Sequence, residues 1–145
     1  MSKQLASLAF SIAAAAVAAA PGTAHAVGDA PIVPAPVYEF EPKRVSMPEV
    51  ELMLQDPAVT FYDVNTMEIW GDGYLPGAIF FNVDDWKELL PQDKDAVLVF
   101  YCQNRLCTSS EMAAREVMKL GYTKVHQMPD GIFGWRLSGR PVERP

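Results

Sequence analysis

Two cysteines, Cys102 and Cys107, stand five positions apart and are the only thiols of this 145-residue chain. They follow residues 96–101, a near-continuous apolar run typical of a strand that is covered on both faces of a parallel sheet. Residues 108–120 then carry the pattern of a helix. Ligand sites of open parallel sheets form between a strand end and a helix start, where free N–H groups and the helix dipole stabilise an anion. We therefore expect Cys102 to have a lowered pKa and to act as a nucleophile near neutral pH.

Cys107 allows three interpretations. A second thiol can attack a persulfide or mixed disulfide on Cys102, release the cargo and leave an intramolecular disulfide. The pair can instead form a static bridge, although closing so small a loop contributes only about 2 kcal/mol of stability. Cys107 can also be a buried small hydrophobe at the start of the helix. We favour the first interpretation, a site that uses both thiols.

The first 26 residues have the layout of a secretory signal peptide. Lys3 provides the basic end, residues 5–20 the apolar centre, and Ala24-His25-Ala26 the small residues of a cleavage site. The alternative is a transmembrane anchor, but the apolar run is mostly Ala and is shorter than the roughly 20 residues that a bilayer crossing needs. We predict cleavage after Ala26 and a periplasmic mature protein, in an oxidising compartment where the two cysteines can form a disulfide.

The charge of the chain argues against two classes of partner. The net charge is −6, and the basic residues are scattered rather than clustered. An acidic surface of this kind is poorly suited to nucleic acid or anionic lipid. We therefore expect no nucleic-acid partner and, after signal cleavage, no membrane contact.

Strands and helices alternate after a proline-rich arm at residues 27–43, which shows no helical or strand period. Ser46 and Glu49 form a capping box that opens a short helix ending near residue 56. The apolar periods and β-branched content of the later segments predict strands at 59–64, 78–82, 96–101 and 124–128, and helices at 84–89 and 108–120. A second capping box, Thr108 with Glu111, opens the last helix. This alternation predicts an α/β fold with a doubly wound parallel sheet.

Several short motifs, in order along the chain, resemble those of the rhodanese family. Asp63-Val64-Asn65 is similar to the family's strand-ending Asp-Val-Arg, and residues 73–78 are similar to its Gly-His-Ile-Pro-Gly-Ala. The pattern continues in the Cys102 loop and in later segments, which are Gly121-Tyr122, Asp130-Gly131, Gly134-Trp135 and residues 139–142. The resemblance implies a rhodanese-like three-layer domain at residues 44–145, with a central parallel sheet flanked by helices.

The resemblance also implies a chemistry. In the family, the cysteine at the position of Cys102 accepts a sulfane sulfur atom as a persulfide and passes it to a thiophilic acceptor such as a thiol. Asp63 and Trp135 would support the site. The residues implied to form the substrate-binding loop are Gln103, Asn104, Arg105, Leu106 and Thr108. The implied partners are a small sulfur donor or thiol acceptor and a periplasmic redox protein.

Departures from the family pattern bear on the substrate. Cys107 stands where the loop often closes with arginine, and Gln103 stands where a basic residue is usual. Arg105 is then the only cation of the loop, so we expect a sulfurtransferase that uses thiosulfate weakly. Asn65 and Tyr74 replace the usual Arg and His, which weakens a structural ion pair.

Other functions have less support from the residues. A related phosphatase group needs an arginine six positions after its cysteine, where this chain has Thr108. Cys102, Cys107 and His126 are too few soft ligands to predict a zinc site, and we expect neither a metal nor another cofactor. The alternative that stays open is a thiol/disulfide redox protein, or a non-catalytic accessory or binding module of a periplasmic oxidation system.

Overall fold

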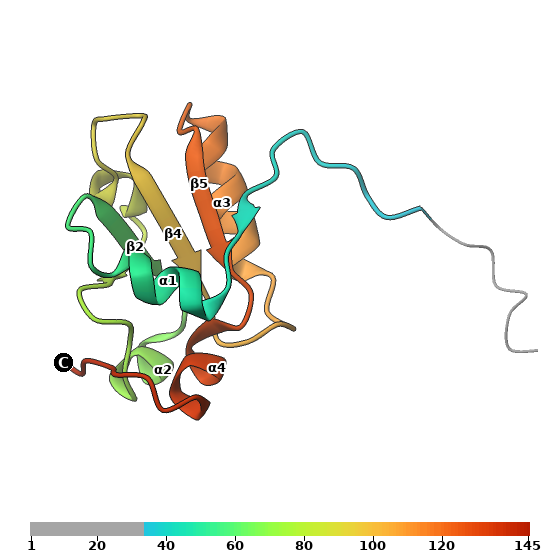
Figure 1. The fold of residues 1–145 in the computed structure, drawn as a ribbon. Coiled ribbons are helices and arrows are strands. Elements are labelled where there is room, and N and C mark those ends of the chain that lie inside the picture. The colour runs from blue at the N-terminus through green and yellow to red at the C-terminus, as the bar shows by residue number, and fades with distance from the viewer. Residues whose placement is uncertain (1–33) are drawn as a thin grey trace, which may run out of the picture. The chain divides into compact units, whose positions relative to one another are not determined.

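Five parallel strands form one sheet in the computed structural model, which describes residues 34–145 (Figure 1). The order across the sheet is β1-β5-β4-β2-β3, and the strands are β1 (Lys43–Arg44), β2 (Val59–Asp63), β3 (Ile79–Phe80), β4 (Val97–Tyr101) and β5 (Lys124–Met128). The helices are α1 (Met47–Met53), α2 (Met67–Gly71), the 3-10 helix η1 (Trp86–Leu89), α3 (Ser109–Lys119) and α4 (Gly131–Leu137). None of the helices within residues 34–145 combines the length and the hydropathy that a membrane crossing requires. The predicted signal peptide lies outside the described residues.

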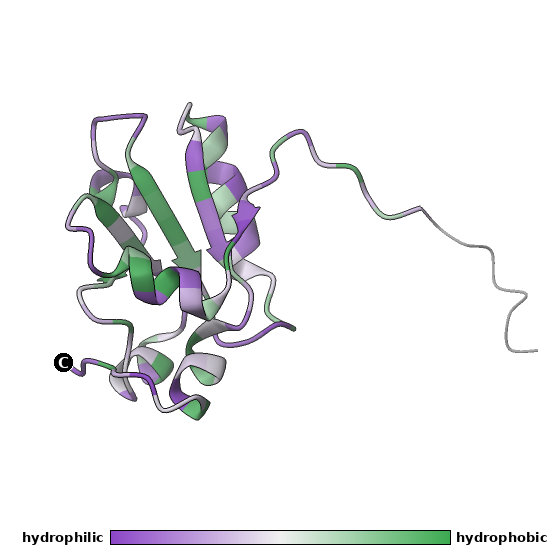
Figure 2. Cartoon of the chain, viewed as in Figure 1, coloured by the Kyte–Doolittle hydropathy of each residue, from purple (hydrophilic) through white to green (hydrophobic). Residues whose placement is uncertain are grey.

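Side chains alternate across the sheet and build one apolar core on each face. Phe61 and Val99 point to the face covered by α1 and α4, whereas Tyr62 and Phe100 point to the face covered by α3 and η1. β4 lies between β5 and β2 and is almost entirely hydrophobic (Figure 2), as expected for a strand with both faces covered. The predicted three-layer α/β fold is therefore confirmed.

One of the two predicted capping boxes is confirmed and the other is wrong. The Glu49 carboxylate accepts the backbone N–H of Ser46 at 2.8 Å, at the start of α1. At the start of α3, Thr108 has a helical backbone and its side chain makes no capping hydrogen bond. The Glu111 carboxylate is instead paired with Arg115, because a guanidinium is a stronger partner for a carboxylate than a backbone N–H is.

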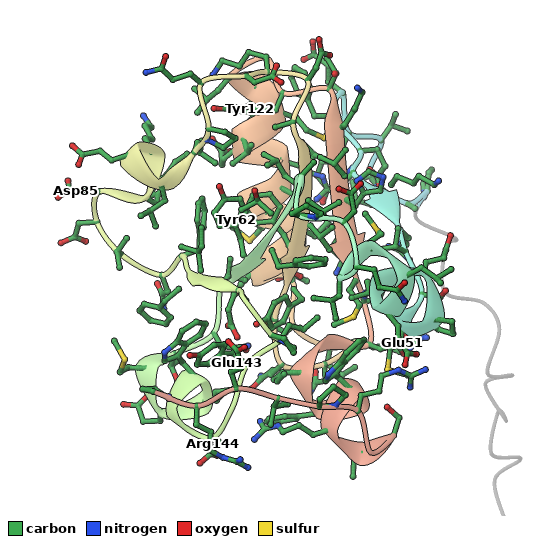
Figure 3. The ribbon with its side chains drawn as sticks, turned by 60° about the vertical axis from the view of Figure 1, so that its left-hand side comes forward. Glu51, Tyr62, Asp85, Tyr122, Glu143 and Arg144 are labelled. Atoms are coloured by element: carbon green, nitrogen blue, oxygen red, sulfur yellow. A yellow bond between two sulfur atoms is a disulfide. The ribbon has the colours of Figure 1, made fainter. Side chains whose placement is uncertain are left out.

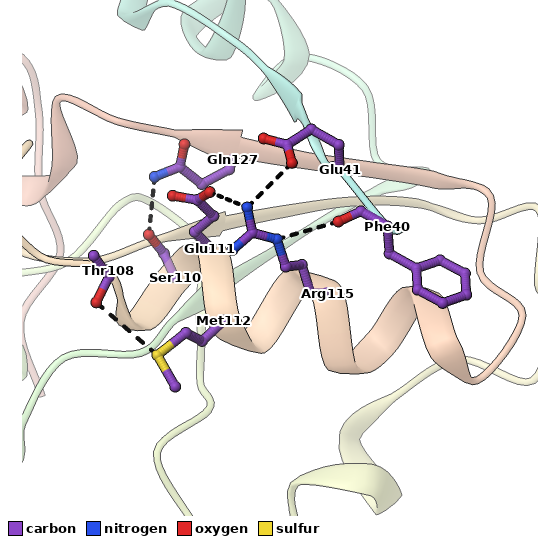
Figure 4. A network of polar contacts seen from close by, with 8 residues as sticks. All are labelled: Phe40, Glu41, Thr108, Ser110, Glu111, Met112, Arg115 and Gln127. Atoms are coloured by element: carbon purple, nitrogen blue, oxygen red, sulfur yellow. Dashed lines mark hydrogen bonds and ion pairs between the residues drawn. The ribbon is translucent and has the colours of Figure 1, made fainter. Parts of the chain in front are cut away.

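The segment before the first helix, residues 37–44, lies against α3 and is named the N-terminal strap (Figure 4). Arg115 of α3 donates to the Phe40 carbonyl at 3.1 Å and pairs with Glu41 at 3.1 Å. Its guanidinium also lies 3.4 Å from the ring centre of Tyr38. The strap ends in β1, which pairs with β5 at the edge of the sheet. One partly buried arginine thus holds the strap on the helix that follows the cysteine loop.

Two tyrosines tie the segment around η1 to the core (Figure 3). The Tyr62 hydroxyl donates to the Leu89 carbonyl at 2.8 Å, and the Tyr122 hydroxyl donates to the Pro91 carbonyl. Both rings belong to the core on the α3 side of the sheet. These hydrogen bonds fix η1, which supplies one wall of the site described below.

Candidate active site

Cys102 follows the last residue of β4, at the carboxyl edge of the parallel sheet. The residue after the neighbouring strand β2 is hydrogen-bonded to this edge, since the N–H of Val64 donates to the Tyr101 carbonyl at 3.1 Å. After Cys102 the chain forms an exposed loop and then enters α3. The backbone N–H groups of residues 103–105 donate to no oxygen atom of the described residues. The predicted placement of the cysteine, between a buried strand and a helix start, is therefore confirmed.

Cys102 and Cys107 form a disulfide, with their Cα atoms 6.3 Å apart. Cys102 is only 4% exposed, whereas Cys107 is half-buried. An external thiolate that reduces this bond reaches the Cys107 sulfur more readily, and Cys102 is then the leaving thiolate. The asymmetry fits a pair in which Cys102 is the protected sulfur and Cys107 is the accessible one.

Gly131, the first residue of α4, packs directly against the Cys102–Gln103 peptide. A methyl group at Gly131 would lie 2.5 Å from the Gln103 carbonyl carbon and 2.6 Å from the Cys102 oxygen. The same turn supplies two hydrogen bonds of 2.9 Å, from the N–H of Ile132 to the Cys102 carbonyl and from the N–H of Phe133 to the Gln103 carbonyl. Gly131 has a φ of +62°, which an L side chain rarely adopts. The Cys102–Gln103 peptide is thus held by a backbone contact that only glycine allows.

The middle of the loop is organised by its own polar groups. The Asn104 side chain accepts the N–H of Leu106 at 3.0 Å, and the Asn104 carbonyl accepts the N–H of Cys107 at 3.1 Å. Arg105 pairs with Asp130 at 2.6 Å. The Leu106 side chain is 91% exposed. The one cation of the loop is therefore engaged by a carboxylate that precedes α4.

A cavity of about 440 Å³ opens beside the disulfide. Of the predicted loop residues, Cys102, Gln103 and Cys107 line this cavity, whereas Asn104, Arg105, Leu106 and Thr108 are not among its lining residues. Its apolar walls come from the ends of β2 and β3, from α2, from η1 and from α3. They include Val64, Ile69, Phe81, Val83, Trp86 and Met112. Its polar lining includes Asn65, Thr66, Asn82, Ser109 and Glu116. A cavity of this size and character suits an organic ligand group.

The two residues expected to support the site are both buried. Trp135 is fully buried between α4 and the sheet, and its indole N–H donates to the Pro141 carbonyl at 2.7 Å. Asp63 ends β2 beside Tyr101, and one carboxylate oxygen accepts the N–H of Asn65 at 2.8 Å. Its other oxygen, and both polar atoms of the Asn65 amide, have no partner within the described residues. Burial raises the pKa of Asp63 above its usual range, and the hydrogen bond from the Asn65 backbone partly opposes this.

Sequence reasoning assigned no role to Gly131 or to the cavity walls. Gly131 lies in one of the motifs on which the family resemblance rests, and an Asp-Gly pair before a helix is a recognisable turn signal. The cavity residues Val83, Trp86 and Met112 are distant in sequence from the cysteine loop or lie on the exposed side of a helix. No local pattern marks them, because the sheet and α3 bring them together only in the folded protein.

Known proteins resemble this chain over the region that carries the site. The family model "Rhodanese-like domain" matches residues 46–138. An HTH-type transcriptional regulator of Mycobacterium tuberculosis is 33% identical over 88 residues, which are 59% of this chain and 38% of the relative. The thiosulfate sulfurtransferase GlpE of Tolumonas auensis is 26% identical over 94 residues, 64% of this chain and 87% of the relative. The chain thus spans less than half of the first relative and most of the second.

A solved structure shares the fold of this chain. The BH2092 protein of Bacillus halodurans superimposes with a TM-score of 0.62 at 22% identity, over 70% of this chain and 77% of that protein. The family model spans both cysteines, the Gly131 turn and all of the sheet except β1. The chain therefore belongs to the rhodanese-like domain family.

Proposed function

We propose that the protein is a sulfurtransferase that carries sulfane sulfur as a persulfide on Cys102, with Cys107 as the resolving thiol. The observation that carries the proposal is the position of Cys102. It ends a buried strand, opens onto a cavity and has a second cysteine within bonding distance. The unpaired N–H groups of residues 103–105 can stabilise the negative charge of a thiolate or persulfide there. The similarity to a thiosulfate sulfurtransferase supports the same class of reaction.

The cycle begins from the disulfide. A thiol reductant attacks Cys107, and a second thiol or a dithiol partner completes the reduction, leaving Cys102 as the thiolate. Cys102 then attacks the sulfane sulfur of a donor and becomes a persulfide. An acceptor thiol can take that sulfur atom. Alternatively, the Cys107 thiolate attacks the inner sulfur, expels hydrosulfide and restores the disulfide, so that two cysteine thiols are oxidised as the sulfane sulfur is reduced.

The test is the intact mass of the reduced protein after incubation with a sulfane donor. A gain of about 32 Da, one sulfur atom, is expected on Cys102 and should be absent in Cys102→Ser. Polysulfide, thiosulfate and a persulfidated small thiol should each be tried. The sulfurtransferase proposal fails if the reduced protein gains sulfur from none of them.

Cys107→Ser tests the resolving role separately. Without the second thiol, the Cys102 persulfide has no internal nucleophile, so the adduct should persist at least tenfold longer and hydrosulfide release should fall in parallel. The measurement is the decay of the adduct by mass spectrometry, beside a sulfide electrode. An unchanged lifetime would reduce Cys107 to a partner in a structural bridge.

A second candidate function is thiol/disulfide exchange with a redox partner protein. The closed Cys102–Cys107 disulfide and the greater exposure of Cys107 favour it. In that case reduced thioredoxin-like partners would reduce the protein rapidly, whereas sulfane donors would add no mass to Cys102. The two assays together therefore distinguish the candidates.

We also propose that the protein acts in the periplasm, after removal of residues 1–26. The layout of that segment supports export, and an oxidising compartment is consistent with a disulfide as the resting form. Expression of the full chain, cell fractionation and N-terminal sequencing provide the test. A cytoplasmic protein that retains its first residues would refute this part of the proposal.

A further inference from the structure

The cavity beside Cys102 has no cationic wall. None of the residues that line it within the described chain is a lysine, an arginine or a histidine. Among residues 34–145, the only charged lining residue is Glu116, an acid on α3. Proteins that bind small anions normally supply arginine, lysine or several converging N–H groups. Here only backbone donors near Cys102 serve that purpose, and the remaining surface is mainly apolar.

Three cations close to the cavity each interact with another side chain. Arg105 pairs with Asp130 at 2.6 Å, and its side chain is 71% exposed. Lys119 pairs with Glu116 at 2.6 Å, which also offsets the charge of that carboxylate at the cavity mouth. Lys87 lies 5.5 Å from the ring centre of Trp86 but does not line the cavity. The space is therefore close to neutral as well as apolar.

Such a cavity disfavours the binding of a divalent anion and favours the binding of an apolar organic group. Thiosulfate would have to give up hydration without a compensating cation, which is strongly unfavourable in an apolar site. An organic substituent that buries about 100 Å² of apolar surface gains roughly 50-fold in affinity. The volume of about 440 Å³ exceeds what a small inorganic anion needs and matches an organic side group.

We infer that the physiological sulfur carrier is an organic persulfide whose substituent is apolar and carries no negative charge. This inference rests on the proposed function of Cys102. The Cys102 thiolate attacks the outer sulfur of R–S–SH, a bond forms between those two sulfur atoms, and the original S–S bond breaks. The electron pair leaves with R–S⁻, and the proton stays on the transferred sulfur. The substituent R lies among the side chains of Ile69, Val83 and Trp86.

The experiment compares donors on the reduced full-length mature protein carrying Cys107→Ser, so that the persulfide accumulates. The donors are benzyl hydropersulfide, a persulfidated peptide with apolar residues on both sides of its cysteine, glutathione persulfide and thiosulfate. Each rate of sulfur gain on Cys102 is divided by the rate at which the same donor reacts with free cysteine. We expect the normalised rate with benzyl hydropersulfide to be at least 50-fold higher than the rate with thiosulfate. It should be at least tenfold higher than the rate with glutathione persulfide. The rate with the persulfidated peptide, compared with the rate with benzyl hydropersulfide, shows whether a protein cysteine or a small thiol is the better carrier.

Charge insertion at the cavity mouth provides the matched test. Val83→Arg and Met112→Arg replace side chains that line the cavity and are 41% and 61% exposed, so both variants should fold. Either cation should raise the normalised rate with thiosulfate, relative to benzyl hydropersulfide, by roughly tenfold. Leu52→Arg, on α1 and 68% exposed, adds the same charge outside the cavity and should leave the ratio unchanged.

The outcomes separate the two claims. If no donor adds sulfur to Cys102, the proposed function fails and the inference falls with it. If thiosulfate reacts as fast as benzyl hydropersulfide after normalisation, only the inference is overturned. It is also overturned if Val83→Arg and Met112→Arg shift the donor ratio no more than Leu52→Arg does.

Discussion

Replacing Gly131 with alanine should lower both the stability and the proposed sulfur transfer, because this glycine touches the peptide that follows Cys102. The new methyl carbon would lie 2.5 Å from the Gln103 carbonyl carbon, whereas ordinary contacts begin at 3.4 Å. The loop must therefore retreat by about 1 Å, since close-packed interiors leave no spare room. That shift would strain or break the hydrogen bonds from Ile132 and Phe133, each 2.9 Å long.

The size of the effect follows from two contributions. A left-handed backbone costs a non-glycine residue roughly 1–2 kcal/mol, and each weakened hydrogen bond costs about 0.5–1.5 kcal/mol. The free energy of unfolding should therefore fall by roughly 2–5 kcal/mol. A displacement of about 1 Å at a nucleophile can also slow its reaction by up to about 100-fold. Urea unfolding measures the first quantity, and the rate of sulfur gain on Cys102 measures the second.

Gly139→Ala is the matched control for this prediction. Gly139 has a φ of +75°, close to the +62° of Gly131, but a methyl group there would meet nothing within 4 Å. The free energy of unfolding of the Gly139→Ala variant should fall only by the backbone contribution of about 1–2 kcal/mol, and its rate of persulfide formation should not change. The reasoning is refuted if both variants lose the same stability and react at the same rate.

Two further predictions concern the buried acid and the strap. Burial raises the folded-state pKa of Asp63 above its usual value of 3.8, so the folded protein holds that proton more tightly than the unfolded chain does. The free energy of unfolding should therefore decrease as pH rises from 3.8 through the raised pKa, and Asp63→Asn should remove this decrease in urea titrations between about pH 4 and pH 7; an unaltered pH profile would contradict it. Arg115→Gln should cost about 1–2 kcal/mol and speed chymotryptic cleavage after Tyr38 roughly tenfold, because it removes the contacts that hold the strap. Lys119→Gln, which breaks only an exposed pair, should change neither quantity measurably, and equal effects of the two variants would argue against the strap contact.

The sequence allowed the central sheet to be predicted because its strands carry strong local signals. β2, β4 and β5 match the predicted segments to within a residue. β2 and β4 are short apolar or β-branched runs, and β5 is a short segment after the helix-ending Gly121. The position of Cys102 followed from the same signals. Ser46 was recognised as a cap because its partner Glu49 lies three residues away.

Other features could not be predicted because they depend on distant contacts. α2 and α4 contain only five and seven residues, too few for a helical period to stand out. β1 has two residues and exists because it pairs with β5. Arg105 was the only cation visible in the loop sequence, but its role is set by Asp130, 25 positions away. The neutrality of the cavity was likewise hidden, because its walls come from four separate parts of the chain.

The two ends of the cysteine loop are held to the rest of the domain in different ways. Its first two peptides are held by α4 through hydrogen bonds to the carbonyls of Cys102 and Gln103. Its outer part carries the exposed Leu106 and is tied back by the Arg105–Asp130 ion pair and by the disulfide to Cys107. Reduction of the disulfide therefore removes one of these two ties, while Cys102 stays where β4 and the hydrogen bonds from α4 hold it. On the proposed mechanism, the redox state of the two cysteines therefore changes how firmly the loop beside the cavity is held, but not the position of the attacking sulfur. A more loosely held loop can admit a sulfur carrier while the Cys102 sulfur keeps its position.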